Sequence, residues 1–214
     1  MLVAFIHGFL LALALILPLG PQNTFVISQG TTHRHYRRTV PVVLTAAFSD
    51  TILIAAAVLG VSFVLMALPV LKEILTFLGI VFLVWMGWQS WRMPVHAVQS
   101  GDAGMAYWTL RRRILHTLRA SLLNPHAIMD TVVVIGGGAA LYPAPADKLA
   151  YALAAALVSW VWFFAISLAG RALGQIHNQA RTLRWMNRLS AGIMWMVAGR
   201  YLVQLGHALW NAQS

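Results

Sequence analysis

Three ionisable side chains lie deep inside apolar stretches of the sequence, where a charge needs a partner. Asp50 stands about eleven residues into the apolar segment 39–66, which corresponds to about 16 Å along a helix. Asp130 and Arg200 lie at similar depths in two other segments. A charged residue at the centre of a bilayer costs about 2.5 to 3.5 kcal/mol, so such residues usually face a partner or a watery cavity. Arg200 can neutralise only one aspartate, which leaves one carboxylate for a proton or a cation.

Two of the apolar segments contain residues that interrupt a helix. The first break combines two prolines and a glycine with two amides: Pro18, Gly20, Pro21, Gln22 and Asn23. The second break consists of Asn124, Pro125 and His126. Proline removes a backbone donor, and broken helices at membrane depth are tolerated where the freed groups line a cavity. Paired breaks point to a binding site, while a simple proline kink is the alternative interpretation.

His126 and Asp130 are one helical turn apart, a spacing that could suit a metal ion. A closed zinc site takes four ligands and a catalytic site three, whereas only two are visible here. We therefore predict no metal site, and nothing in the sequence calls for another cofactor.

The composition excludes a water-soluble globule. Of 214 residues, 60% are hydrophobic and 9% are charged, whereas soluble domains carry about 25% charged residues. The net charge of +10 comes from basic residues in the gaps between apolar segments, as membrane topology requires. Nucleic-acid binding is not needed to explain the charge, so we expect no nucleic-acid partner. The chain has no cysteine, which excludes thiol redox chemistry.

A bilayer-spanning helix needs about 20 mostly apolar residues, and six segments qualify. They are residues 2–28, 39–66, 74–91, 114–140, 149–169 and 189–210. The longest connection, 92–113, is too short for a soluble domain. We therefore predict an all-α, polytopic membrane protein with six transmembrane helices in one domain, residues 1–214.

Arginines cluster after the first, third and fifth segments, which places these connections in the cytoplasm. Both termini are then expected outside, in the periplasm of a Gram-negative cell. The loop with Arg34, Arg37 and Arg38 is expected to contact anionic membrane lipid. The two halves, about 1–93 and 114–212, are weakly alike, and three spans in each would make them inverted repeats.

The motifs resemble those of the lysine exporter family of bacterial inner-membrane transporters, most closely its arginine exporter branch. They are residues 18–23 (PLGPQN), residues 49–51 (SDT), and residues 123–126 (LNPH) together with Asp130 and Thr131. The resemblance covers essentially the full length. It implies efflux of L-arginine, with lysine and toxic analogues such as canavanine as further candidates, driven by the proton motive force. The family's paired membrane aspartates correspond to Asp50 and Asp130.

The chemistry of the candidate residues agrees with this resemblance. A carboxylate accepts a guanidinium bidentately, and Gln22, Asn23, Asn124, His126 or Arg200 could bind the rest of the substrate or the proton. Burial disfavours a charged carboxylate, so a proton and a cation would compete for Asp50 in an antiport cycle.

The sequence leaves several alternatives open. Efflux of another amino acid or of a divalent metal cation is the alternative within transport. A membrane enzyme would need a nucleophile and a base among Ser49, His126 and Asp50, and no such motif is present, so we predict no enzyme. A structural subunit would not need charges at the midplane. The preference for arginine or lysine, the proton stoichiometry and a homo-oligomeric state stay open.

Overall fold

The regular structure of the chain is entirely helical in the part that the computed structural model describes, which confirms the all-α prediction. The structure describes residues 1–214 except 19, 34, 68–70, 93–106, 174–178 and 212–214. Side chains at Pro21, Pro125 and His126 also lie outside the described part, as do those of residues 61–73, 75, 76, 172, 173, 179–183 and 207–211.

Each half of the chain contains an interrupted helix followed by two long helices. The first half comprises α1 (Leu2–Ile16), α2 (Pro21–Thr32), the 3-10 turn η1 (Tyr36–Arg38), α3 (Val40–Ala67) and α4 (Leu71–Arg92). The second half comprises α5 (Leu110–Leu122), α6 (Pro125–Met129), the π-helix η4 (Asp130–Gly136), α7 (Gly137–Ala139), α8 (Pro145–Leu173) and α9 (Gln179–Asn211).

All six predicted segments are helical, but the helices extend beyond the apolar residues. α8 begins four residues before the predicted segment 149–169, and α9 begins ten residues before 189. The added residues include charged side chains, Asp147 and Lys148 in α8 and three arginines in α9, so hydropathy alone underestimates the helix length. Both predicted breaks are present, after Ile16 and after Leu122.

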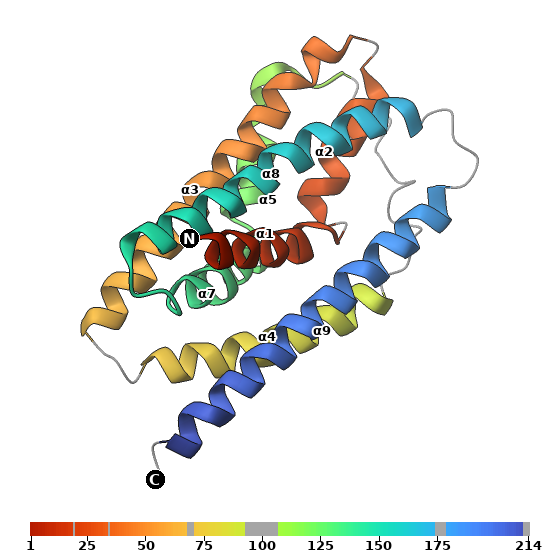
Figure 1. The fold of residues 1–214 in the computed structure, drawn as a ribbon. Helices are drawn as coiled ribbons and strands as arrows, with labels where there is room; N and C mark the ends of the chain where they lie inside the picture. The colour runs from red at the N-terminus through yellow and green to blue at the C-terminus, as the bar shows by residue number, and fades with distance from the viewer. Residues whose placement is uncertain (19, 34, 68–70, 93–106, 174–178, 212–214) are drawn as a thin grey trace.

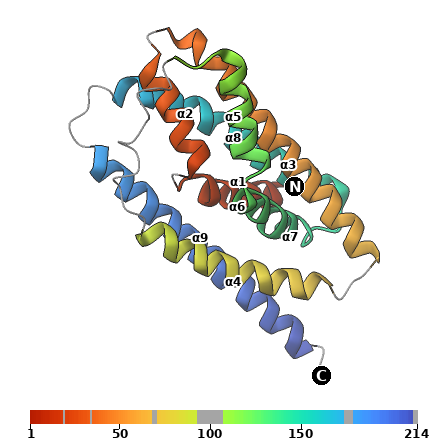
Figure 2. The ribbon, with the colours of Figure 1, turned by 180° about the vertical axis from the view of Figure 1, so that it is seen from behind.

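The helices pack in two groups (Figures 1 and 2). α1 and α2 contact α8, while α5 and η4 contact α3, and α3 also packs on α8. α4 and α9 lie side by side along one side of the molecule. Three glycines allow close backbone approach, because a Cβ at Gly8, Gly30 or Gly170 would overlap backbone atoms of the facing helix. The α1–α2–α8 unit is therefore tightly packed.

The outer surface exposes many large apolar side chains. Leu59, Leu153, Met196 and Val203 are each more than half exposed, and they come from three different helices. Extended apolar surface of this kind marks contact with a membrane or a protein. By length and hydropathy, Val40–Gly60 and Pro145–Arg171 are candidate membrane spans, and Leu2–Ile16 and Ala127–Ala139 are shorter apolar helices.

Candidate functional site

A cavity of about 300 Å³ lies between the two interrupted helices and the long helices. This volume is at the lower end of the range for small-molecule sites. Its polar lining comes from α2, α3, α4, α8 and the segment 124–135: Gln22, Asn23, Asp50, Gln89, Ser90, Asn124, Asp130, Thr131 and Ser159. The structure thus brings both predicted aspartates and three of the predicted amides together.

Asp50 on α3 is the carboxylate whose surroundings are most clearly defined. Gln22 Nε2 donates to its Oδ1 over 3.3 Å, and Ser159 Oγ donates to its Oδ2 over 3.1 Å. Among the residues that the structure describes, no cationic side chain forms an ion pair with Asp50. In the described part of the chain, the carboxylate is therefore held in position by two neutral donors and has no cationic partner.

The position of Asp50 is fixed by the crossing of α3 and α8. Trp160 Nε1 donates to Thr51 Oγ1 over 3.1 Å, and the Trp160 ring meets the Phe48 ring edge-on, with centroids 5.0 Å apart. These contacts flank the bond between Ser159 and Asp50. They hold two long helices in register at the cavity wall.

Asn23 lines the cavity, but its amide group forms hydrogen bonds that stabilise the first break. Its Nδ2 donates to the Ile16 carbonyl over 2.6 Å and to the Pro18 carbonyl over 2.8 Å. Its Oδ1 accepts a hydrogen bond from Trp162 Nε1 over 3.3 Å. The carbonyl groups at the end of a helix have no partners within it, and the Asn23 amide donates hydrogen bonds to two of them. All its polar atoms are thus used within the protein.

The break gives α2 an N-terminus that faces the cavity wall. α2 begins with Pro21 directly after Gly20, and no side chain caps it. The first amide groups of a helix have no partner within it, and the helix dipole favours an anion there. A Cβ added at Gly20 would meet no atom within 4 Å. Because φ of Gly20 is −71°, the glycine is required neither by its backbone angle nor by packing.

The second break places Asp130 in the lining of the same cavity. Leu123 and Asn124 separate α5 from α6, and the helix widens into a π-helix that begins at Asp130. π-helical turns are rare and often mark functional sites. Thr131 Oγ1 donates back to the Ala127 carbonyl over 2.8 Å, which stabilises the irregular turn.

Two predicted site residues are not part of the described cavity. Arg200 is exposed on α9 and does not line the cavity, so the structure does not place it beside Asp50, one of its two expected partners. Its positive charge is near enough to His7, Tyr142 and Tyr201 to interact with them electrostatically. The side chain of His126 lies outside the described residues.

Sequence reasoning missed three polar lining residues, Ser159, Gln89 and Ser90. Neutral polar residues occur throughout membrane helices, so their type gives no signal until the helix faces are known. Within the described residues no group of three His, Asp or Glu lies close enough to hold a metal ion.

The opposite end of α2 is held by a buried arginine. Arg113 on α5 donates from Nη1 to His33 Nε2 over 2.9 Å and to the Arg38 carbonyl over 2.7 Å. A longer contact of 3.4 Å reaches Gln29 Oε1. Burial, then the charges of Arg113 and Arg38, lower the pKa of His33 below its ordinary value. The neutral imidazole is therefore the form that accepts the Arg113 hydrogen bond.

Comparison with known proteins identifies relatives over nearly the whole chain. The arginine exporter protein ArgO of Yersinia enterocolitica is 39% identical over 202 residues, which cover 92% of this chain and 95% of that protein. ArgO of Salmonella paratyphi A is 34% identical over 216 residues, covering 99% and 100%. YisU of Bacillus subtilis, named as a candidate amino-acid transporter, is 39% identical over 202 residues, covering 94% and 90%. No solved structure matches the chain.

These relatives indicate a membrane protein that transports and does not catalyse a reaction. The family model described as LysE type translocator matches residues 13–205. The chain therefore belongs to the LysE type translocator family.

Proposed function

We propose that the protein exports L-arginine through the cavity, with Asp50 as the group that binds the guanidinium. The observation that carries this proposal is the Asp50 carboxylate, held by Gln22 and Ser159 with no cationic partner in the described chain. A guanidinium is planar and always charged, and it matches a carboxylate bidentately. The names of the ArgO relatives support the same substrate.

The remaining cavity groups suit the α-amino-acid end of the substrate. The uncapped N-terminus of α2 and the Gln22 amide offer donors to a carboxylate. Asp130, which also lines the cavity, suits an ammonium group. Lysine and canavanine are further candidates, because both carry a cationic or guanidinium-like end.

Export of a cation needs an energy source, which we propose is proton antiport. Moving one positive charge against an inside-negative potential costs about 2.3 kcal/mol per 100 mV. A proton and a guanidinium neutralise the same carboxylate, so the entry of one at Asp50 releases the other. One proton inward for one arginine outward is electroneutral.

We propose a path across the bacterial inner membrane made of six spans in two inverted halves, with both termini outside. The packing supports this arrangement, since α1 and α2 contact α8 as α5 and η4 contact α3. The symmetry also pairs α3 with α8 and α4 with α9, and each of these pairs is in contact. The arginines after the third span, Arg92 and Arg111–Arg113, fit a cytoplasmic connection.

Efflux of labelled arginine from cells that lack their own exporter tests the proposal. Asp50→Asn removes the negative charge and the group that binds the proton, so we expect efflux to fall by at least about tenfold. Ser49→Ala, on the same helix as Asp50, is the control, because the Ser49 hydroxyl donates to the Thr45 carbonyl and not to Asp50. Normal efflux by Asp50→Asn would move the cation site elsewhere, with Asp130 the next candidate.

The substrate is tested by competition. Citrulline has the shape of arginine but a neutral urea in place of the guanidinium. If Asp50 recognises charge, excess citrulline on the substrate side will not slow arginine efflux, whereas canavanine and arginine will. Equal competition by citrulline would contradict recognition by a carboxylate.

A further inference from the structure

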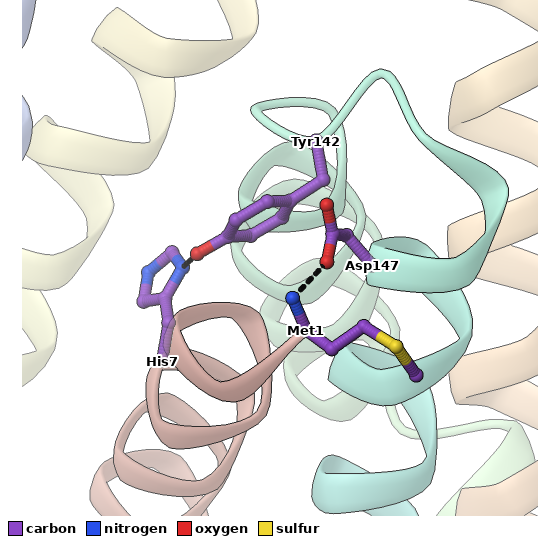
Figure 3. Close-up of polar contacts among 4 residues, drawn as sticks. All are labelled: Met1, His7, Tyr142 and Asp147. Carbon is purple, nitrogen blue, oxygen red and sulfur yellow. Dashed lines mark hydrogen bonds and ion pairs between the residues drawn. The ribbon is translucent and has the colours of Figure 1, made fainter.

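A buried histidine on α1 joins three elements at one end of the cavity. His7 is 3% exposed, and both of its ring nitrogens are hydrogen-bonded. Nδ1 pairs with the hydroxyl of Tyr142, in the connection between α7 and α8, over 2.9 Å (Figure 3). Nε2 pairs with the hydroxyl of Tyr201 on α9, also over 2.9 Å. The imidazole therefore bridges α9 and the α7–α8 connection.

Aromatic rings fill the space around this imidazole. Tyr151 on α8 meets the His7 ring edge-on with centroids 5.4 Å apart, and Tyr201 does so at 5.6 Å. Gly138 on α7 is required here, because a Cβ at this position would overlap the hydroxyl groups of Tyr151 and Tyr201. The four rings thus form a packed plug with no room for an added methyl group.

The plug adjoins the cavity through a shared core cluster, in which the cavity-lining Ala12 and Ile135 pack together with Tyr151 and Tyr201. Ala12 and Leu15 line the cavity on α1, and His7 precedes Ala12 by five residues, about 7.5 Å along the helix. Ile135 on η4 also lines the cavity, and Gly138 follows it by three residues. Along the axis of α1, the rings therefore lie between the cavity and the N-terminus of that helix.

The hydrogen bonds of His7 cross the contact between the α1–α8 unit and α9, where Ser190 on α9 also donates to the Ala14 carbonyl on α1. α1 is fixed to α8 by the close approach at Gly8 and by the ion pair between Met1 and Asp147 (Figure 3). α9, which carries Tyr201, packs mainly on α4. The bond between Tyr201 and His7 therefore ties the α4–α9 pair to the α1–α8 unit.

We propose that the bonds of His7 with Tyr142 and Tyr201 lock a gate that closes the cavity on the side of the N-terminus of α1. The gate opens when α9 and the α7–α8 connection separate from His7 and the rings move apart. This inference rests on the proposed function in one respect, that the cavity is the transport site. It does not depend on which amino acid is carried.

Cysteine labelling tests the gate, because the natural chain contains no cysteine. Ala12→Cys places one thiol at the cavity wall, and Ala144→Cys places one on the exposed α7–α8 connection. A membrane-impermeant maleimide is applied to spheroplasts or inverted vesicles, whichever exposes Ala144→Cys. From that side Ala144→Cys labels rapidly, and Ala12→Cys labels slowly because the plug separates it from the reagent. Rapid labelling of Ala12→Cys would overturn the proposal.

Tyrosine variants in the Ala12→Cys background separate the hydrogen bonds from the bulk of the rings. Tyr201→Phe and Tyr142→Phe each remove a hydroxyl that is bonded to His7, so we expect labelling to accelerate about fivefold. Tyr151→Phe is the matched control, because the buried Tyr151 hydroxyl has no hydrogen-bond partner among the described residues. It should leave the labelling rate unchanged.

The outcomes distinguish this inference from the proposed function. Equal labelling rates in Tyr201→Phe, Tyr142→Phe and Tyr151→Phe would show that His7 holds no gate, whatever the efflux assay gives. Faster labelling in the first two variants alone supports the gate even if arginine is not the substrate. Circular dichroism and yield in detergent confirm that each variant is folded before labelling.

Discussion

Ser159 on α8 donates its hydroxyl to Asp50 Oδ2 on α3 over 3.1 Å, at the point where the two long helices cross beside the cavity. The bond orients the carboxylate without neutralising it. A serine at this place leaves the negative charge available to a substrate cation, whereas an arginine or lysine would satisfy it permanently.

Ser159→Ala is expected to lower arginine efflux about threefold to tenfold, because the carboxylate loses one of its two orienting donors. The measurement is the initial efflux rate per inserted protein at low internal arginine. Ser49→Ala is the matched control, since the Ser49 hydroxyl donates to the Thr45 carbonyl and forms no hydrogen bond with the Asp50 carboxylate. Equal loss in both variants would assign the effect to helix packing.

Neighbouring amides in the first break are expected to have separate roles. Asn23→Ala removes donors to the Ile16 and Pro18 carbonyls, so we expect the free energy of unfolding to fall by about 2 to 4 kcal/mol. Gln22→Ala removes only the bond to Asp50, so it should reduce efflux while leaving stability nearly unchanged. Thermal unfolding in detergent and efflux per inserted protein are measured together. The reverse pattern would make Asn23 the substrate ligand.

The sequence predicted the helices and both breaks because each has a local signal. Runs of apolar residues define the helices, and proline interrupts the backbone wherever it occurs. The carboxylates were found for a similar reason, since a charge in an apolar run stands out. The π-helix at Asp130 was not predicted, because a change from i→i−4 to i→i−5 bonding leaves no pattern in residue type.

The exposed position of Arg200 could not be predicted, because depth along a helix does not say which way a side chain points. On α9 the buried face contains Ser190, Met194, Val197 and Tyr201, at spacings of three or four residues. Arg200 precedes Tyr201 by one residue, about 100° around the helix, and is exposed. The direction of the Arg200 side chain follows only from the packing of α9 on α1 and α4.

Gly20 offers a way to fill the cavity without disturbing the fold. Gly20→Ala should fold and insert normally, because the added Cβ meets no atom within 4 Å. Gly20→Leu should fold as well but block efflux, since Gly20 lines the cavity. Gly30→Ala is the contrasting variant, because its Cβ would overlap the Ser167 backbone and reduce the inserted yield. Normal efflux by Gly20→Leu would place the substrate path elsewhere.

The contact of His33 with Arg113 predicts a pH dependence of stability. The folded pKa of His33 is lowered by burial first and then by Arg113 and Arg38, whereas the unfolded value is about 6.5. Between the two values the unfolded chain binds more protons, so stability is complete above about pH 6.5 and falls as the pH decreases below it. Protonation also removes the Nε2 lone pair that accepts from Arg113.

The thermal unfolding midpoint of purified protein should therefore decrease on going from about pH 7.5 to about pH 5.5, and decrease less in His33→Gln. The glutamine side chain can still accept a hydrogen bond from Arg113 but does not titrate. His35→Gln serves as control, because His35 is exposed two residues away and should keep the wild-type pH response. If His33→Gln loses as much stability as the wild type over this range, another buried group governs the acid sensitivity. His7 and His116, which lie within the helices, would then be the next residues to substitute.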